Sequence, residues 1–181
     1  MFKKTMLAVI MATAGSGAMA QLYVGGGLGY AVVSDYCKGA SGSCDDNSMG
    51  LKLYGGFQLN PSAAVEVAYL DFGQAKYDVS WMHSNLEASA VTVNLAVRAP
   101  LSRELGAVGR VGLARVTVDE HFNWRSDRSK STSQLYLGLG LEYALQKNLK
   151  ATFSYDLTRG EDAGGGGGNL HLFSAGLQYA F

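Results

Sequence analysis

The feature that most constrains this chain is a strict alternation of large apolar side chains with small or polar ones. In residues 134–144, Leu135, Leu137 and Leu139 alternate with Tyr136 and Gly138. Side chains of a β-strand point alternately to two faces, so this pattern predicts strands with one apolar and one small or polar face. We assign eight such segments, at residues 22–33, 49–59, 63–72, 89–98, 105–118, 134–144, 149–159 and 170–181.

The lengths of the segments and of their connections predict how the strands are arranged. Each segment has about the 9–11 residues that a tilted strand needs to cross a bilayer. Short connections (60–62, 99–104, 145–148) alternate with long polar ones (34–48, 73–88, 119–133, 160–169). Short turns at one end, long loops at the other and an even strand number are typical of outer-membrane proteins. We therefore predict an all-β fold, an eight-stranded antiparallel up-and-down transmembrane β-barrel.

A soluble eight-stranded barrel of the lipocalin type is the main alternative fold. Such a barrel turns its large apolar side chains inward to hold a ligand. Here the second face carries Gly, Ala, Ser, Thr and charged residues, which suit a narrow lumen, whereas the Leu- and Val-rich face suits lipid. The equal numbers of basic and acidic residues, 15 each, argue against a nucleic-acid partner.

The N-terminus has the features of an export signal. Lys3 and Lys4 precede an apolar stretch at 6–14, and Ala18 and Ala20 form a small-x-small cleavage site. We expect residues 1–20 to be a signal peptide cleaved after Ala20, and residues 21–181 to form the barrel domain. The short apolar stretch disfavours the alternative, an N-terminal membrane anchor.

Export would place the only two cysteines of the chain, Cys37 and Cys44, in an oxidising compartment. Both lie in one polar connection, and an oxidising compartment favours a disulfide between them. Two free thiols are the alternative, and the spacing is not that of a C-x-x-C redox site.

Two stretches resemble a known family. Residues 50–61, GLKLYGGFQLNP, followed by 65–73, VEVAYLDFG, resemble the strand two, turn, strand three signature of the OmpA-like transmembrane domain family. The ending GLQYAF (176–181) is also similar to that family, which implies that Phe181 belongs to a signal read by the barrel-insertion machinery. The resemblance spans residues 21–181 and implies a bacterial outer-membrane location, among outer-membrane lipids and lipopolysaccharide. It is specific for fold and location and says little about function.

Charged residues on the inward face predict a network inside the barrel. Counted from the short turns, Glu66, Arg110 and Glu142 lie near one end, whereas Lys52 and Asp156 lie nearer the middle. Buried charges need partners, so we expect these groups to pair. The network is either a gate, opened when ion pairs exchange partners, or a structural plug. We favour the plug because side chains fill the interior of an eight-stranded barrel.

The long connections carry the candidates for ligand binding. Exposed aromatic and basic side chains there suit a surface or host ligand, and an equally weighted alternative is that the strands continue past the membrane with these aromatics packed together. The candidates are Tyr77, Trp81, Phe122, Trp124, Arg125 and Arg128.

An enzyme that modifies the acyl chains of lipid A is a further alternative, and the residue spacing argues against it. His83 and His121 lie in long polar connections, where a solvated histidine is the ordinary interpretation. The candidate pair, His171 and Ser174, is three residues apart and therefore points to opposite faces of a strand. We expect a non-enzymatic structural or surface protein without metal or cofactor. A narrow pore for small solutes or ions is the leading alternative function.

We also expect aromatic girdles at the membrane interfaces, with Tyr30, Tyr69, Phe72 and Phe173 at the loop end.

Overall fold

The computed structural model describes residues 21–34, 43–45, 47–79, 82–122, 125–161 and 167–181. For 43–45, 74–79, 82–86, 120–122 and 125–128 it describes the backbone alone. The strands are β1 (Leu22–Val33), β2 (Ser43–Asp45), β3 (Asn47–Asn60), β4 (Ala63–Val79), β5 (Met82–Pro100), β6 (Leu105–Phe122), β7 (Arg125–Ala144), β8 (Leu149–Glu161) and β9 (Gly167–Ala180).

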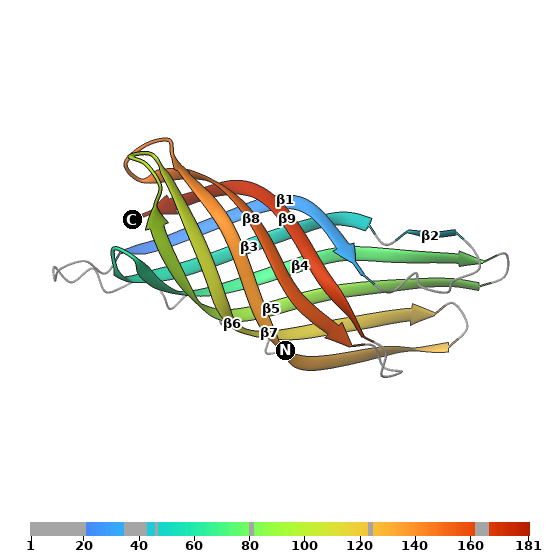
Figure 1. Cartoon of the computed structure of the whole chain (residues 1–181). Coiled ribbons are helices and arrows are strands. Elements are labelled where there is room, and N and C mark those ends of the chain that lie inside the picture. Colours follow the sequence, from blue (N-terminus) through green and yellow to red (C-terminus); the bar gives the residue numbers. More distant parts are fainter. Residues whose placement is uncertain (1–20, 35–42, 46, 80–81, 123–124, 162–166) are drawn as a thin grey trace, which may run out of the picture.

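The strands form a closed antiparallel barrel, as predicted (Figure 1). Each of the eight strands β1 and β3–β9 pairs with its neighbours along the chain, and β1 pairs with β9 to complete the ring. The short β2 adds to the far end of β4, outside the ring. Closure pairs every barrel strand on both sides, which a sheet in lipid requires. None of the described residues belongs to a helix that could span a membrane.

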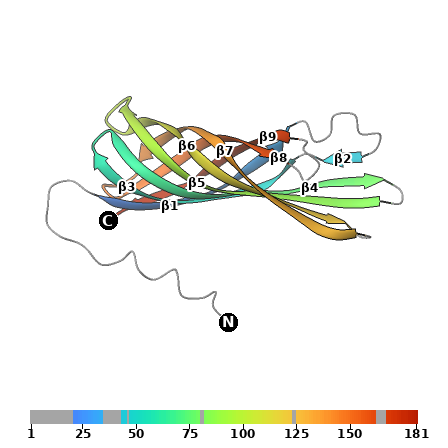
Figure 2. The same ribbon diagram turned by 90° about the horizontal axis from the view of Figure 1, so that it is seen from below.

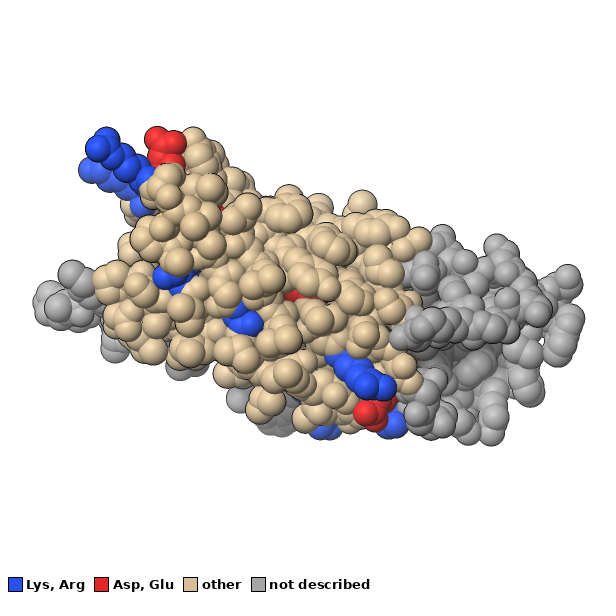
Figure 3. Space-filling view, viewed as in Figure 1, with Lys and Arg blue, Asp and Glu red and all other residues tan. Residues whose placement is uncertain are grey.

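The alternation in the sequence matches the two faces of the barrel wall. On β5, Val91, Val93 and Leu95 are exposed on the outside, whereas Thr92 and Asn94 are buried in the lumen. Large apolar side chains therefore cover the outside, where lipid replaces water, and Figure 3 shows a wall that is largely free of charge between its two ends.

Strands β4 to β7 run past the barrel and form an extension (Figures 1 and 2). The β4–β5 ladder reaches Val79 and Met82, and the β6–β7 ladder reaches Phe122 and Arg125. Most of the connections at 73–88 and 119–133 is therefore strand, in agreement with the alternative that the strands continue past the membrane. The eight segments assigned from the sequence end too early because the alternation used to find them is an apolar signal.

A β-bulge marks the point where β4 leaves the barrel. The β4–β5 register shifts between Asp71 and Gln74, and Gly73 between them has a positive φ of 67°. A carboxylate oxygen of Asp71 accepts a hydrogen bond from the Gly73 amide at 2.8 Å. Because only glycine adopts this conformation freely, Gly73 allows the strand to bend away from the barrel axis.

The lumen is divided along its length into a polar and an apolar part. The half nearer the extension is filled by an apolar cluster that includes Leu70, Phe72, Val116, Leu170 and Leu172. Phe72, expected in an outer girdle, is 1% exposed and lies in this cluster, because it falls on the inward parity of β4. The charged residues occupy the half nearer the short turns.

Candidate functional site

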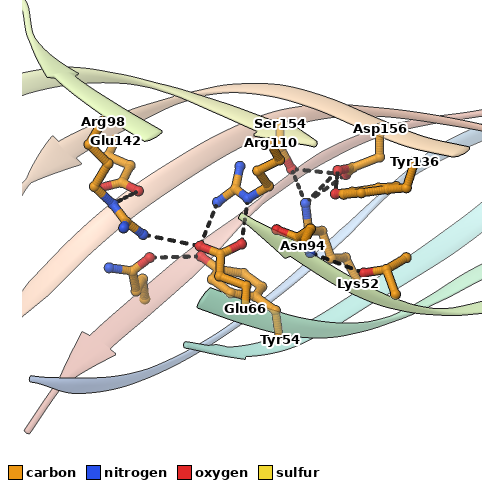
Figure 4. A network of polar contacts seen from close by, with 12 residues as sticks. Lys52, Tyr54, Glu66, Asn94, Arg98, Arg110, Tyr136, Glu142, Ser154 and Asp156 are labelled. Atoms are coloured by element: carbon orange, nitrogen blue, oxygen red, sulfur yellow. Dashed lines mark hydrogen bonds and ion pairs between the residues drawn. The ribbon is translucent and has the colours of Figure 1, made fainter. Parts of the chain in front are cut away.

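The charged half of the lumen contains two groups of polar contacts (Figure 4). We name the first the turn-side cluster: Tyr23, Glu66, Arg98, Arg110, Glu142 and Lys150. We name the second the mid-lumen cluster: Lys52, Tyr136, Ser154, Asp156 and Ser174. Because alternation fixes which side chains point inward, each of the eight barrel strands contributes at least one residue to these two clusters.

Glu66 is the centre of the turn-side cluster. Its carboxylate accepts hydrogen bonds from Arg110 Nε at 2.6 Å, Arg98 Nη2 at 3.1 Å and the Tyr23 hydroxyl at 2.6 Å. The Glu66 side chain is fully buried, so this carboxylate is stabilised by two guanidinium groups and a phenol in place of water.

Arg98 joins Glu66 to a second carboxylate. Its Nε donates to Glu142 at 2.9 Å while its Nη2 donates to Glu66. Glu142 also pairs with Lys150 Nζ at 2.8 Å, and the Lys150 side chain is 36% exposed. The guanidinium of Arg98 lies over the Tyr23 ring, 4.7 Å from its centroid. The turn-side cluster therefore runs from the buried Glu66 to the rim of the barrel.

The mid-lumen cluster surrounds the ion pair of Lys52 and Asp156. Lys52 Nζ lies 2.7 and 2.8 Å from the two carboxylate oxygens of Asp156 and 3.3 Å from Ser154 Oγ. The hydroxyls of Tyr136 and Ser154 also donate to Asp156, and Ser154 bonds to Ser174 across the β8–β9 pair. Lys52 and Asp156 are 2% and 0% exposed, so both charges depend on these contacts.

Two tyrosines fill the space around the charges. The Tyr54 ring lies between Arg110 and Lys52, with the cations 5.6 and 5.5 Å from its centroid. The Tyr23 ring passes over Gly56, where an added Cβ would lie 2.2 Å from its Cζ. The glycine on the inward face of β3 is thus what gives Tyr23 its room.

The buried charges balance. Lys52, Arg98 and Arg110 are matched by Glu66, Glu142 and Asp156, all of them 10% exposed or less. Among the described side chains, the Nη1 atoms of Arg98 and Arg110 are buried without a hydrogen-bond partner. Paired charges and tyrosines thus occupy the turn-side half of the lumen, and the apolar cluster follows them along the axis.

The structure places the four predicted lumen charges in two groups. Glu66 and Arg110 are in direct contact, whereas Glu142 reaches them only through Arg98, and Lys52 pairs with Asp156 instead. Arg98 was missed although its inward parity was visible in the sequence, because it lies close to a turn and was not counted with the charges. Tyr23 and Tyr136 were missed because a network was sought among charged residues alone.

The loop candidates lie on strands of the extension or outside the described residues. Tyr77 lies on β4, Phe122 on β6, and Arg125 and Arg128 on β7, so their backbones belong to strands of the extension. Trp81, Trp124 and Cys37 lie outside the described residues, and Cys44 lies in β2, where the backbone alone is described. The disulfide between Cys37 and Cys44 stays a prediction.

The His and Ser pair considered for catalysis lies on opposite faces of β9. Ser174 is buried in the lumen, whereas the outward His171 pairs through Nδ1 with the Tyr155 hydroxyl at 2.8 Å. The barrel wall therefore separates the two side chains.

The outward aromatics Tyr30, Tyr69 and Phe173 are exposed at the loop end, as an interfacial girdle requires.

Comparison with known sequences identifies relatives among outer-membrane proteins. The family model of the OmpA-like transmembrane domain matches residues 17–181. Outer membrane protein A of Escherichia fergusonii is 26% identical over 196 residues, covering 99% of this chain and 56% of the relative. That of Escherichia coli O157:H7 is also 26% identical, covering 86% of this chain and 47% of the relative. The chain thus spans about half the length of the curated relatives it matches.

Solved structures agree on the fold. Neisserial surface protein A superposes with a TM-score of 0.66 at 15% identity, covering 88% of this chain and 97% of the other. Ail, the attachment invasion locus protein of Yersinia pestis, gives 0.60 at 16% identity, with 90% and 99% covered. At this identity the likeness concerns the barrel and its strand order.

Proposed function

The chain belongs to the OmpA-like transmembrane domain family and is a β-barrel of the bacterial outer membrane. On this basis we propose that it is a surface protein without enzymatic activity, whose lumen is closed. Its barrel would serve as an anchor in the membrane, and its extension would present the surface that meets ligands. The observation that carries the closed state is the charge-balanced set of buried side chains in the lumen.

The lumen contacts support a plug. Glu66 has three donors within 3.1 Å, and Asp156 receives Lys52 together with two hydroxyl groups. To pass an ion, the barrel would have to separate these groups in a region of low dielectric, which costs several kcal/mol for each unpaired charge. The apolar cluster around Phe72 and Leu172 would add a second barrier.

The experiment is single-channel recording in a planar lipid bilayer. The native protein, shown to be folded by its heat-modifiable gel mobility, is expected to give no reproducible current steps. Replacing both Glu66 and Glu142 by Gln breaks the pairing of Arg98 and is expected to produce steps. Steady conductance of the native protein would contradict the plug and favour the pore.

The narrow pore is kept as a second candidate because of one specific contact. Arg98 is shared between two carboxylates, and Glu142 has a second partner, Lys150, at the rim. This arrangement gives Glu142 an alternative ion pair if Arg98 moves. Lys150→Gln, which removes that alternative ion pair, would then lower the open fraction in the same recording, whereas a rigid plug would be closed in both proteins.

For the extension, we propose an anionic polysaccharide as the ligand class. Arg125, Arg128 and Lys130 lie together at the start of β7. Ail of Yersinia pestis has been crystallised in complex with the heparin analogue sucrose octasulfate, and a cluster of basic residues on a strand suits such sulfate groups.

Retention on immobilised heparin tests this ligand class. Arg125→Gln with Arg128→Gln should elute at lower salt than the native protein. The control, Arg103→Gln with Lys147→Gln, removes the same charge from the exposed short turns and should elute unchanged. Equal elution of all three proteins would exclude the extension as a polysaccharide site.

A further inference from the structure

The barrel wall is split between β7 and β8 on the side of the extension. The β7–β8 ladder stops at Leu137 and Leu157. Beyond that point β7 pairs with β6 as far as Arg125, and β8 pairs with β9 as far as Glu161. Among the described residues, β7 therefore has a strand on one side only from Arg125 to Tyr136.

Side chains bridge the split where the ladder is missing. Thr158 Oγ1 donates to the Leu135 carbonyl at 3.0 Å. Glu161 accepts from Gln134 Nε2 at 3.0 Å and lies 3.6 Å from Lys130 Nζ. The split is thus a polar strip in the wall.

The same level is the boundary between the apolar and polar outer surfaces. On β6 and β7, the last outward apolar pair is Leu113 with Leu135, and the next outward pair is Arg115 with Ser133. On β8 the outward side chain that follows Leu157 is Arg159. This change from Leu to Arg is what a barrel shows where hydrocarbon ends and lipid head groups begin.

Two guanidinium groups at this boundary have no carboxylate partner among the described residues. Arg115 is exposed and donates from Nη1 only to the Ser133 hydroxyl, at 3.3 Å. Arg159 is exposed, and its guanidinium nitrogens lie over Gly167 of β9. The buried arginines of the lumen, in contrast, are all paired with glutamates.

A histidine adds to the basic character of this sector. Arg159 is paired across the ladder with Asn169, so His171 is its diagonal neighbour on β9. The Tyr155 hydroxyl holds His171 Nδ1, which fixes the ring on the outer surface.

The two arginines lie in one sector of the barrel wall. The outward residues that continue the register of Arg115 onto β5, β4 and β3 are uncharged: Val91, Tyr69 and Leu53. A one-sided pair of guanidinium groups indicates a localised anion, since a general attraction to a charged membrane surface would be served by cations all round.

We propose that Arg115 and Arg159, with His171 beside Arg159, bind the phosphate groups of lipid A, the lipid part of lipopolysaccharide, at the split between β7 and β8. Arg115 and Arg159 lie on the two strands that flank β7, one on each side of the split. Two separate guanidinium groups suit a glycolipid head group that carries more than one phosphate. Leu113, Leu135, Leu137 and Phe153 below them offer the apolar surface for its acyl chains.

The test is lipid binding by native mass spectrometry, with protein isolated from outer membranes in detergent. The probes are diphosphorylated lipid A, the same lipid A after removal of both phosphates, and phosphatidylglycerol. The native protein should bind diphosphorylated lipid A at least tenfold more tightly than either of the other lipids. Arg115→Gln with Arg159→Gln should lower that affinity about 25-fold, from about fivefold for each basic residue at a membrane surface.

Two further variants decide the interpretation. Arg115→Lys with Arg159→Lys keeps the charge but not the bidentate geometry, and should lose part of the affinity. Arg103→Gln with Lys147→Gln removes two charges at the opposite end and should bind as the native protein does. Gel mobility with and without heating shows that each variant is folded, and if the Gln variant does not fold, the Lys variant provides the comparison.

The proposal would be overturned by any of three results: native affinity in the Gln variant, an equal loss in the control at the short turns, or equal binding of phosphatidylglycerol and diphosphorylated lipid A. The last result would indicate attraction to anionic lipid in general. None of these results depends on whether the lumen conducts or the extension binds a polysaccharide.

Discussion

Removing the carboxylate of Glu66 is expected to be among the most destabilising single changes in this protein. In Glu66→Met the volume is nearly kept, but Arg110 loses its ion pair, Arg98 loses one of two, and the Tyr23 hydroxyl loses its acceptor. Breaking a buried pair by removing one partner costs about 3–5 kcal/mol. The buried charge balance also changes by one, since three cations then face two anions.

The double variant separates pairing from packing. Glu66→Met with Arg110→Met restores the balance, because Arg98 retains Glu142 and Lys52 retains Asp156. Apolar replacement of a whole buried pair is often neutral. The remaining loss of stability comes from the Tyr23 hydroxyl, which is buried without an acceptor and costs about 1–3 kcal/mol. The double variant should therefore be more stable than Glu66→Met alone.

The assay is equilibrium unfolding by denaturant in phospholipid vesicles, followed by tryptophan fluorescence and by gel mobility. Glu104→Gln, which removes an exposed carboxylate in a short turn, serves as the control and should keep the native midpoint. A loss below about 1 kcal/mol in Glu66→Met, or a double variant as unstable as the sum of the two single variants, would refute the buried network as a source of stability.

Three further predictions follow from the same geometry. Gly56→Ala should destabilise the barrel by about 1–3 kcal/mol in the same assay, because the new Cβ displaces the Tyr23 ring; an unchanged midpoint would mean that the ring has room to move. Lys52→Met should cost about 3–5 kcal/mol by leaving Asp156 buried without its cation, and a native midpoint would argue against that pair. His171→Ala should leave the acyl-chain composition of lipid A unchanged in cells, as measured by mass spectrometry, whereas a changed composition would reopen the enzymatic alternative.

The extent to which the sequence predicted the lumen differs between residues. Alternation placed Lys52, Glu66, Arg110 and Glu142 on the inward face, and all four are buried there. The partners of these residues were not predictable in the same way. Contact across a closed barrel depends on the stagger between strands, and a shift of two residues on one strand keeps the face but changes the level. Arg98 joins Glu66 to Glu142 only in the register that the closed ring adopts.

The strands of the extension, in contrast, could not be assigned from the alternation in the sequence. Residues 73–79 and 125–133 lack the apolar alternation that marks the barrel strands, because above the membrane neither lipid nor a packed lumen selects it. Their pairing follows from continuation of the β4–β5 and β6–β7 hairpins beyond the wall. The apolar cluster around Phe72 was missed for a related reason, since the inward face was assumed to be polar along its whole length.

By itself, the sequence determined that this chain crosses a membrane with strands, how many there are, and which side chains face lipid. Those properties depend on a local period of two and on segment length, which every strand carries independently. Only the tertiary structure decided which charges pair, where the lumen becomes apolar and where β7 parts from β8. These features depend on register between strands that are distant in the chain, and register becomes fixed when the sheet closes and each buried polar group has to find its partner.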